Sequence, residues 1–148
     1  MAANNLPMYT KNILNSAGGS AAPTAFSATI TLAANDFTGA GANNVLVATA
    51  GTNGSFLQKL IFKATGSNTA ITVARVFLNN GLTNATAANN TMIAEYMLPV
   101  TTASTSALTS PAQDLILNVP IQAGSRIYVG LTVAAAGGWQ CTPVYGEY

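Results

Sequence analysis

The sequence predicts an all-β protein: a single β-sandwich of jelly-roll type with about eight strands, preceded by an extended N-terminal arm. Several short segments alternate apolar and hydroxyl residues with a period of two, as strands with one buried face do. Turns rich in Gly, Asn and Pro separate these segments at near-regular spacing. No long stretch has the 3.6-residue period and the caps of a helix. These three observations favour a sandwich or barrel over any helical fold.

The first strand shows the alternation most clearly, at residues 26–32. Its pattern predicts that Phe26, Ala28, Ile30 and Leu32 point inward, with Thr and Ser outside because β-branched side chains suit a pleated surface. The remaining strands are expected at residues 45–49, 56–64, 71–78, 92–98, 115–119, 126–133 and 139–145.

Turn residues mark the connections between these strands. Asn53-Gly54 predicts a tight turn in which both residues have positive φ. Within residues 56–64 we expect Phe56, Leu60 and Phe62 on one face, with Lys59 and Lys63 on the other. Eight strands with long cross-connections favour a jelly roll, and the Cys–Trp–Cys spacing of an antibody domain is absent from the sequence.

The chain has 148 residues, the usual size of one domain. We expect an arm at residues 1–25 and a β-sandwich domain at residues 26–148. The apolar side chains of the arm are too few to form a core of their own: Leu6, Met8, Tyr9, Ile13 and Leu14. A Gly-, Ser- and Ala-rich connector follows them at residues 16–23. The arm either packs back on the domain or docks on a neighbouring subunit, and we expect the second.

The composition argues against an enzyme. With no His there is no imidazole base for a Ser or Cys nucleophile and no His metal ligand, and the single Cys141 cannot build a zinc site. We therefore expect no catalytic residues, no metal and no cofactor. A net charge of +1 gives no basic footprint for nucleic acid. The sequence has neither a membrane-length apolar run nor a secretory signal, so we expect synthesis in a cytoplasm and no membrane partner.

The low charge also points to assembly. Charged residues make up 6% of the chain, against about 25% in typical soluble domains. A near-neutral surface of this kind promotes association. A small-residue surface rich in Thr and Asn is the simpler explanation, but we favour a surface that neighbours cover.

One pair of opposite charges is predicted to lie across two strands. If residues 79–90 close a hairpin, Arg75 lies opposite Glu95, with Phe77 opposite Ile93 and Val73 opposite Met97. Opposite charges directly across a ladder are a favoured pair. We interpret Arg75 and Glu95 as a structural ion pair on an otherwise apolar face, since the sequence shows no second acid that would make it catalytic.

Large aromatic side chains gather near the C-terminus of the sequence. Tyr128, Trp139 and Tyr145 are a candidate aromatic contact site that could stack on sugar rings. Aromatic residues at such positions are more often core or interface anchors, because each of them buries a large area. Cys141 lies in register with Trp139 and is expected to be buried.

Several segments together resemble a family of small proteins from tailed-bacteriophage virion gene clusters. They are SFLQKLIFK at 55–63, ARVFLNNG at 74–81, TNATAANNTMIAE at 83–95, LPVTT at 98–102, IQAGSRIYVGL at 121–131, AGGWQ at 136–140 and GEY at 146–148. The resemblance covers most of the chain after residue 51, and the first 50 residues match only loosely.

The resemblance implies a capsid decoration or cement protein, which is a β-rich and often trimeric protein on the outside of an icosahedral shell. It implies the major capsid protein as partner, a homotrimer, and a place on the capsid surface of the virion after synthesis in the host cytoplasm. It transfers no active site. The alternative is a sugar- or receptor-binding module of a phage tail or fibre, which has the same composition.

Overall fold

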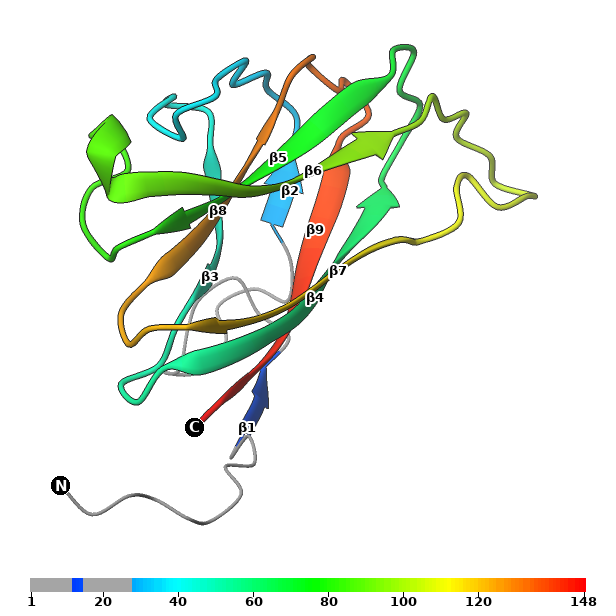
Figure 1. Cartoon of the computed structure of the whole chain (residues 1–148). Helices are drawn as coiled ribbons and strands as arrows, with labels where there is room; N and C mark the ends of the chain where they lie inside the picture. Colours follow the sequence, from blue (N-terminus) through cyan, green and yellow to red (C-terminus); the bar gives the residue numbers. More distant parts are fainter. Residues whose placement is uncertain (1–11, 15–27) are drawn as a thin grey trace, which may run out of the picture.

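The computed structural model describes residues 12–14 and 28–148, which form nine strands and one 3₁₀ turn, η1, at Ala87–Asn89 (Figure 1). The strands are β1 Asn12–Leu14, β2 Ala28–Ile30, β3 Val45–Thr49, β4 Ser55–Ala64, β5 Thr72–Asn79, β6 Asn90–Leu98, β7 Gln113–Ile121, β8 Arg126–Leu131 and β9 Trp139–Glu147.

The strands form two antiparallel sheets that pack face to face. Sheet A has the order β1-β9-β4-β7, with β2 also pairing with β9, and sheet B has the order β3-β8-β5-β6. The buried apolar residues of the two inner faces form one core cluster. The predicted all-β sandwich is therefore confirmed, with β1 added to the eight expected strands.

The pairing pattern is that of a jelly roll. β5 pairs with β6, β4 with β7, β3 with β8 and β2 with β9, so the chain forms a ribbon of nested antiparallel pairs. Rolling this ribbon up adds the pairs β4–β9 and β5–β8 and separates the strands into two sheets. Two sheets of this kind are the architecture of a jelly roll.

Trp139 and Tyr145 on β9 are the largest side chains in the core, and both are almost completely buried. Phe62 on β4 and Leu98 on β6 pack in the same cluster. Cys141, between Trp139 and Tyr145 along β9, is buried in this cluster, and the burial raises the pKa of its thiol far above the ordinary value. The period-two pattern of β9 thus places every second residue in the core.

A short strand and two bulges change three of the expected positions. Leu32 is exposed because β2 ends at Ile30. A register shift between Leu57 and Lys59 turns Leu57 into the core in place of Phe56, which is half-buried. A second shift, after Val76, puts Phe77 opposite Met92, so its expected pairing with Ile93 is wrong.

The turn predicted at Asn53-Gly54 also differs. The Gly54 N–H donates to Gly51 O at 3.1 Å, and of the two predicted turn residues Gly54 alone has a positive φ, of 88°. The turn is therefore a four-residue turn that closes on glycine, and it does not need positive φ at Asn53.

Most of the predicted arm lies outside the described residues, including Leu6, Met8 and Tyr9. Ile13 and Leu14 belong to β1, which pairs with β9 of the same chain at Gly146 and Tyr145. This backbone pairing places β1 on the chain's own domain.

Candidate functional site

Four loops connect the strands at the same end of the jelly roll, which we call the loop end; of these, the β6–β7 loop projects furthest from the sheets (Figure 1). Because the strands of the ribbon alternate in direction, every second connection reaches this end. The loops are β2–β3 (31–44), β4–β5 (65–71), β6–β7 (99–112) and β8–β9 (132–138).

The loop end carries most of the exposed apolar side chains in the described part of the chain. Six of the ten large ones lie in the four loops: Leu32, Phe37, Ile71, Val100, Leu108 and Val133. Met97, at the adjoining end of β6, is also exposed. Exposed apolar side chains that gather in this way mark a surface for interaction.

A buried asparagine ties three of these loops together. The Asn68 amide donates to Gly66 O at 3.4 Å, Thr101 Oγ1 at 3.1 Å and Gly138 O at 3.3 Å. Its Oδ1 accepts the Gly137 N–H at 3.0 Å. The backbones of Asn68 and Thr101 also exchange two hydrogen bonds, at 3.0 and 2.9 Å. The β4–β5, β6–β7 and β8–β9 loops are therefore fixed to one another from inside.

Thr72 makes a second connection beside the first. Its Oγ1 donates to Val133 O at 2.9 Å and accepts the Val133 N–H at 3.0 Å. The Ala135 N–H donates to Thr31 O at 2.9 Å, which joins the β8–β9 loop to the β2–β3 loop. The backbone around Asn68, Thr101 and Val133 is thus preorganised, and binding through this part of the loop end costs little ordering entropy.

Asp36 organises the β2–β3 loop. Its Oδ1 accepts hydrogen bonds from the backbone and hydroxyl of Thr38, and its Oδ2 accepts them from the Gly41 N–H and the Asn44 amide. Burial alone would raise the pKa of Asp36, but these hydrogen bonds outweigh it and lower the pKa to about 2.

Asn44 also fixes this loop to sheet B. It packs directly on Gly130 of β8, where the side chain of any other residue would not fit.

Asp36→Asn should destabilise the protein at neutral pH, because an amide NH₂ then faces two of the four donors. The folded pKa of Asp36 is below its ordinary value of 3.8, so its contribution is full above that value and disappears as the pH falls to about 2. Urea unfolding at several pH values checks this, with Asp114→Asn as the control. If the difference in the free energy of unfolding between Asp36→Asn and the wild type stayed constant as the pH fell from neutral to about 2, the prediction would be contradicted.

Arg75 and Glu95 lie opposite each other, as the sequence predicts, and Val73 lies opposite Met97. Arg75 Nε is 2.8 Å from Glu95 Oε1. The face is not the apolar one that we expected: the core cluster takes the neighbours Ala74 and Val76, and the Glu95 side chain is 45% exposed.

Arg75 also holds the β2–β3 loop on the outside of sheet B. Its Nη1 donates to Asp36 O at 3.2 Å. The Phe37 ring stacks on its guanidinium, with 3.5 Å between Arg75 Cζ and the centroid of the ring. A cation over an aromatic face is attracted by the ring. Arg75 thereby holds the exposed Phe37 on the outer face of sheet B.

Arg75→Met should lower the free energy of unfolding by about 1–3 kcal/mol, since one charged hydrogen bond and the loop contact are lost. This is less than the about 3–5 kcal/mol of a fully buried pair, because Glu95 remains partly hydrated. A double-mutant cycle with Glu95→Gln should show coupling of about 0.5 kcal/mol or more. Simple addition of the two single effects would show that the pair contributes nothing.

The three aromatic residues of the predicted contact site are buried. Trp139 and Tyr145 are core residues, and Tyr128 lies beside Phe77 at 8% exposure. They do not come together on the surface, so the sugar-stacking interpretation of these three residues is wrong. The interpretation as core anchors holds.

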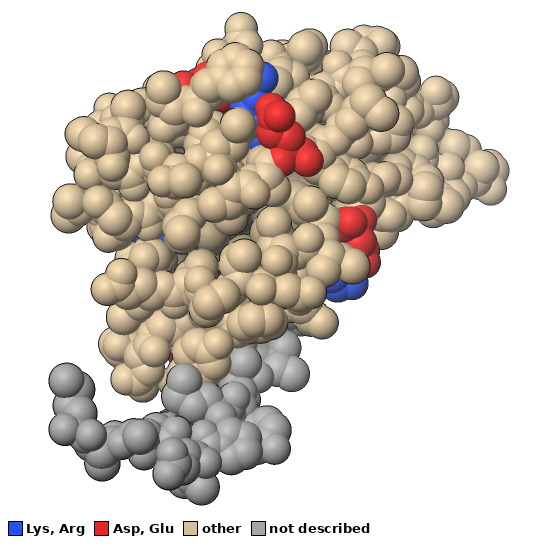
Figure 2. Space-filling view, in the orientation of Figure 1, with Lys and Arg blue, Asp and Glu red and all other residues tan. Residues whose placement is uncertain are grey.

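Charged atoms occupy only small patches of the surface in Figure 2. Lys59 Nζ lies 2.6 Å from Asp114 Oδ2 on sheet A, and Lys63 donates to Ser110 O.

Within the described residues, no three His, Cys, Asp or Glu side chains group as a metal site would require. No helix among them is long and apolar enough to span a membrane.

Comparison with known proteins gives no match: no family model, no curated protein and no solved structure is significantly similar to this chain. The assignment of the loop end as an interaction surface therefore depends on its geometry alone. Sequence reasoning did not single out Asn68, Thr72 or Thr101, because a polar residue between two strands is ordinary turn composition.

Proposed function

We propose that this protein is a structural component of a bacteriophage virion, which decorates and cements the outside of the capsid shell through protein–protein contacts. The loop end carries the proposal, because it presents exposed apolar side chains, and Asn68 and Thr72 fix three of its four loops to one another. The sequence segments that resemble phage virion proteins support it independently.

The proposed partner is the major capsid protein, and the proposed state is a homotrimer at three-fold positions of the shell. A closed symmetric oligomer suits a surface with few charges. The mechanism would be differential binding: a chain that binds the assembled shell but not free subunits stabilises assembly. Many weak contacts add up over a lattice.

The buried aromatic residues make the tail or fibre alternative weaker. A sugar-binding module of that kind was predicted to expose Trp139 and Tyr145, and both lie in the core. The two functions also differ in copy number, because a decoration protein occupies sites all over the shell.

The first experiment locates the chain in purified particles of the encoding phage by mass spectrometry and cryo-electron microscopy. We expect it on the outer capsid surface, in far more copies than a tail component. Its absence from the particle, or a position only in the tail, would overturn the proposal.

The second experiment measures how the isolated protein binds to capsid shells that lack it. Leu108→Ser at the loop end should weaken binding by about tenfold, a loss of about 1.4 kcal/mol. Leu82→Ser is the matched control, because Leu82 is similarly exposed but lies in the β5–β6 loop at the other end. Equal binding by the two variants would show that the loop end is not the contact surface.

A further inference from the structure

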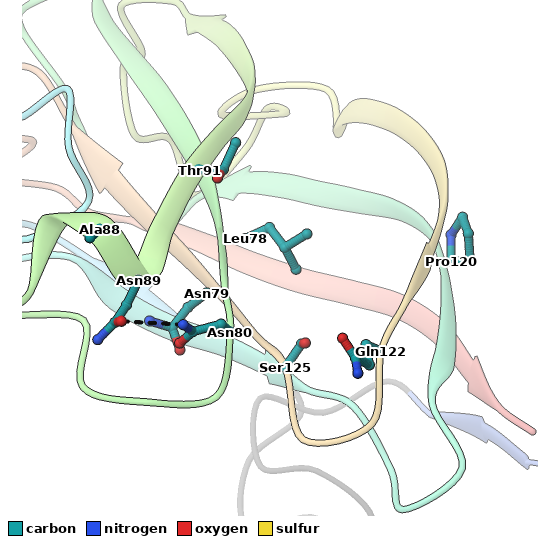
Figure 3. A pocket seen from close by; sticks show the side chains of 9 residues that line it. All are labelled: Leu78, Asn79, Asn80, Ala88, Asn89, Thr91, Pro120, Gln122 and Ser125. Atoms are coloured by element: carbon teal, nitrogen blue, oxygen red, sulfur yellow. Dashed lines mark hydrogen bonds between the residues drawn. The ribbon is translucent and has the colours of Figure 1, made fainter.

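A cavity of about 340 Å³ lies away from the loop end, between the β5–β6 loop and the β7–β8 turn (Figure 3). β5 begins at the loop end and leads into the β5–β6 loop, and β8 begins at the β7–β8 turn and leads to the loop end. The cavity therefore lies at the end of the sandwich opposite the loop end. The polar residues that line it are Asn79, Asn80, Asn89, Thr91, Gln122 and Ser125. Its volume is at the lower end of the range of about 300–1,000 Å³ that small-molecule pockets occupy.

The lining is neutral. No Lys, Arg, Asp or Glu is among the residues that line this cavity. A charged ligand would lose hydration here without gaining a counter-ion. The cavity is therefore suited to an uncharged ligand that needs hydrogen bonds.

The asparagines mainly build the wall. Asn80 Nδ2 donates to Asn89 Oδ1 at 3.2 Å, as Figure 3 shows. Asn79 Nδ2 donates to Asn90 Oδ1 at 2.8 Å, and its Oδ1 accepts the Gly81 N–H at 2.9 Å. These bonds hold the β5–β6 loop in place before any ligand binds, so the wall is preformed.

Three other polar side chains of the lining are unengaged. Within the described residues, the Ser125 hydroxyl, the Gln122 amide and the Thr91 hydroxyl have no hydrogen-bond partner. Ser125 is 6% exposed, so its hydroxyl has little access to bulk water other than through the cavity. In Figure 3 the Ser125 side chain points from the turn toward Leu78, and the Gln122 amide points toward Ser125. Together they offer both donors and acceptors to a ligand.

The apolar part of the lining completes the recognition. Leu78 and Pro120 contribute aliphatic surface. A sugar ring has hydroxyls around its edge and C–H groups on its faces, which matches a few polar groups beside an apolar surface. We propose that this cavity binds one residue of a neutral saccharide, with its hydroxyls on Ser125, Gln122 and Thr91 and a C–H face on Leu78 and Pro120.

Saturation-transfer difference NMR on the full chain tests the proposal. The probes are glucose, galactose, mannose and N-acetylglucosamine, with their methyl glycosides, and glucuronate as the charged comparison. At least one neutral sugar should receive saturation, and glucuronate should receive none. Binding of a methyl glycoside as well would indicate the terminal residue of a glycan, and binding of the free sugar alone would indicate a free ligand.

Gln122→Ala should weaken this binding by about tenfold, whereas Gln140→Ala on β9 should leave it unchanged. The thermal unfolding of both variants shows whether they are folded. Gln122→Ala should also leave attachment to capsid shells unchanged, which separates this site from the loop end. No transfer to any neutral sugar, or equal transfer in the two variants, would overturn the proposal.

Discussion

Asn68→Ala should lower the free energy of unfolding by about 2–4 kcal/mol, which is large for a residue between two strands. The two amide hydrogens lose the acceptors that they share, Gly66 O, Thr101 Oγ1 and Gly138 O, and the half-buried Gly137 N–H loses its acceptor; each hydrogen bond contributes about 1 kcal/mol. Urea unfolding followed by circular dichroism measures the effect.

Asn68→Asp sharpens this test because it has nearly the same shape. Its carboxylate can still accept from the Gly137 N–H, but its second oxygen would face the Gly66 and Gly138 carbonyls in place of the amide donor. We expect it to destabilise at least as much as Ala at neutral pH. Asn53→Ala, which removes one exposed bond to Tyr148 O, is the control. If Asn68→Asp matched the wild type, the amide donor would be unnecessary.

The same variants connect stability with the proposed function. A loosened loop end must be ordered again on binding, so Asn68→Ala should bind capsid shells more weakly even at temperatures where it is fully folded. Faster hydrogen exchange at residues 65–71 and 132–138, with protection retained in β5 and β8, would show that the loosening is local.

Trp139→Ala should lower the free energy of unfolding by about 3–5 kcal/mol, because it leaves a large cavity between the two sheets. Trp139 is fully buried and pairs with Ile30 on one side and Ala64 on the other. Leu108→Ala, at an exposed position, should change stability by no more than about 0.5 kcal/mol. Chemical unfolding followed by circular dichroism suits this comparison, since the chain has one Trp.

Trp139→Phe should cost clearly less than Trp139→Ala. The indole Nε1 is buried and has no hydrogen-bond partner within the described residues, so its removal relieves a desolvation penalty. The smaller ring still fills much of the space. If Trp139→Phe lowered the free energy of unfolding as much as Trp139→Ala, the volume of the ring would not be what stabilises the core, and the prediction would be wrong.

The strands were largely predictable because one buried face leaves a period-two pattern in the sequence. Residues 45–49 were predicted with the bounds of β3, and the expected segment 139–145 falls within β9. The cross-strand position of Arg75 and Glu95 followed from hairpin closure. Local pattern and turn chemistry decided these features.

The bulges and the loop end were not predictable in the same way. The register shift after Leu57 inverts the face of Phe56, and a two-residue period carries no mark of it. Asn68 acts through residues far along the chain, so its sequence context shows only a polar loop. The alternation along β5 did not show that Ala74 and Val76 take the core face, nor that the β2–β3 loop contacts Arg75 on the other face.

The nested ribbon sets how the chain must fold. Its innermost pair, β5–β6, closes a short loop, whereas β2 and β9 must meet across more than a hundred residues of sequence. Closure entropy for such distant pairs is lost before their contacts form, so a high contact order predicts slow folding, in milliseconds to seconds. β9 joins β1, β2 and β4 in one sheet, so β2 and β4 have open edges until it docks. Refolding at high protein concentration should therefore compete with aggregation through those edges, and dilution should raise the yield of native protein.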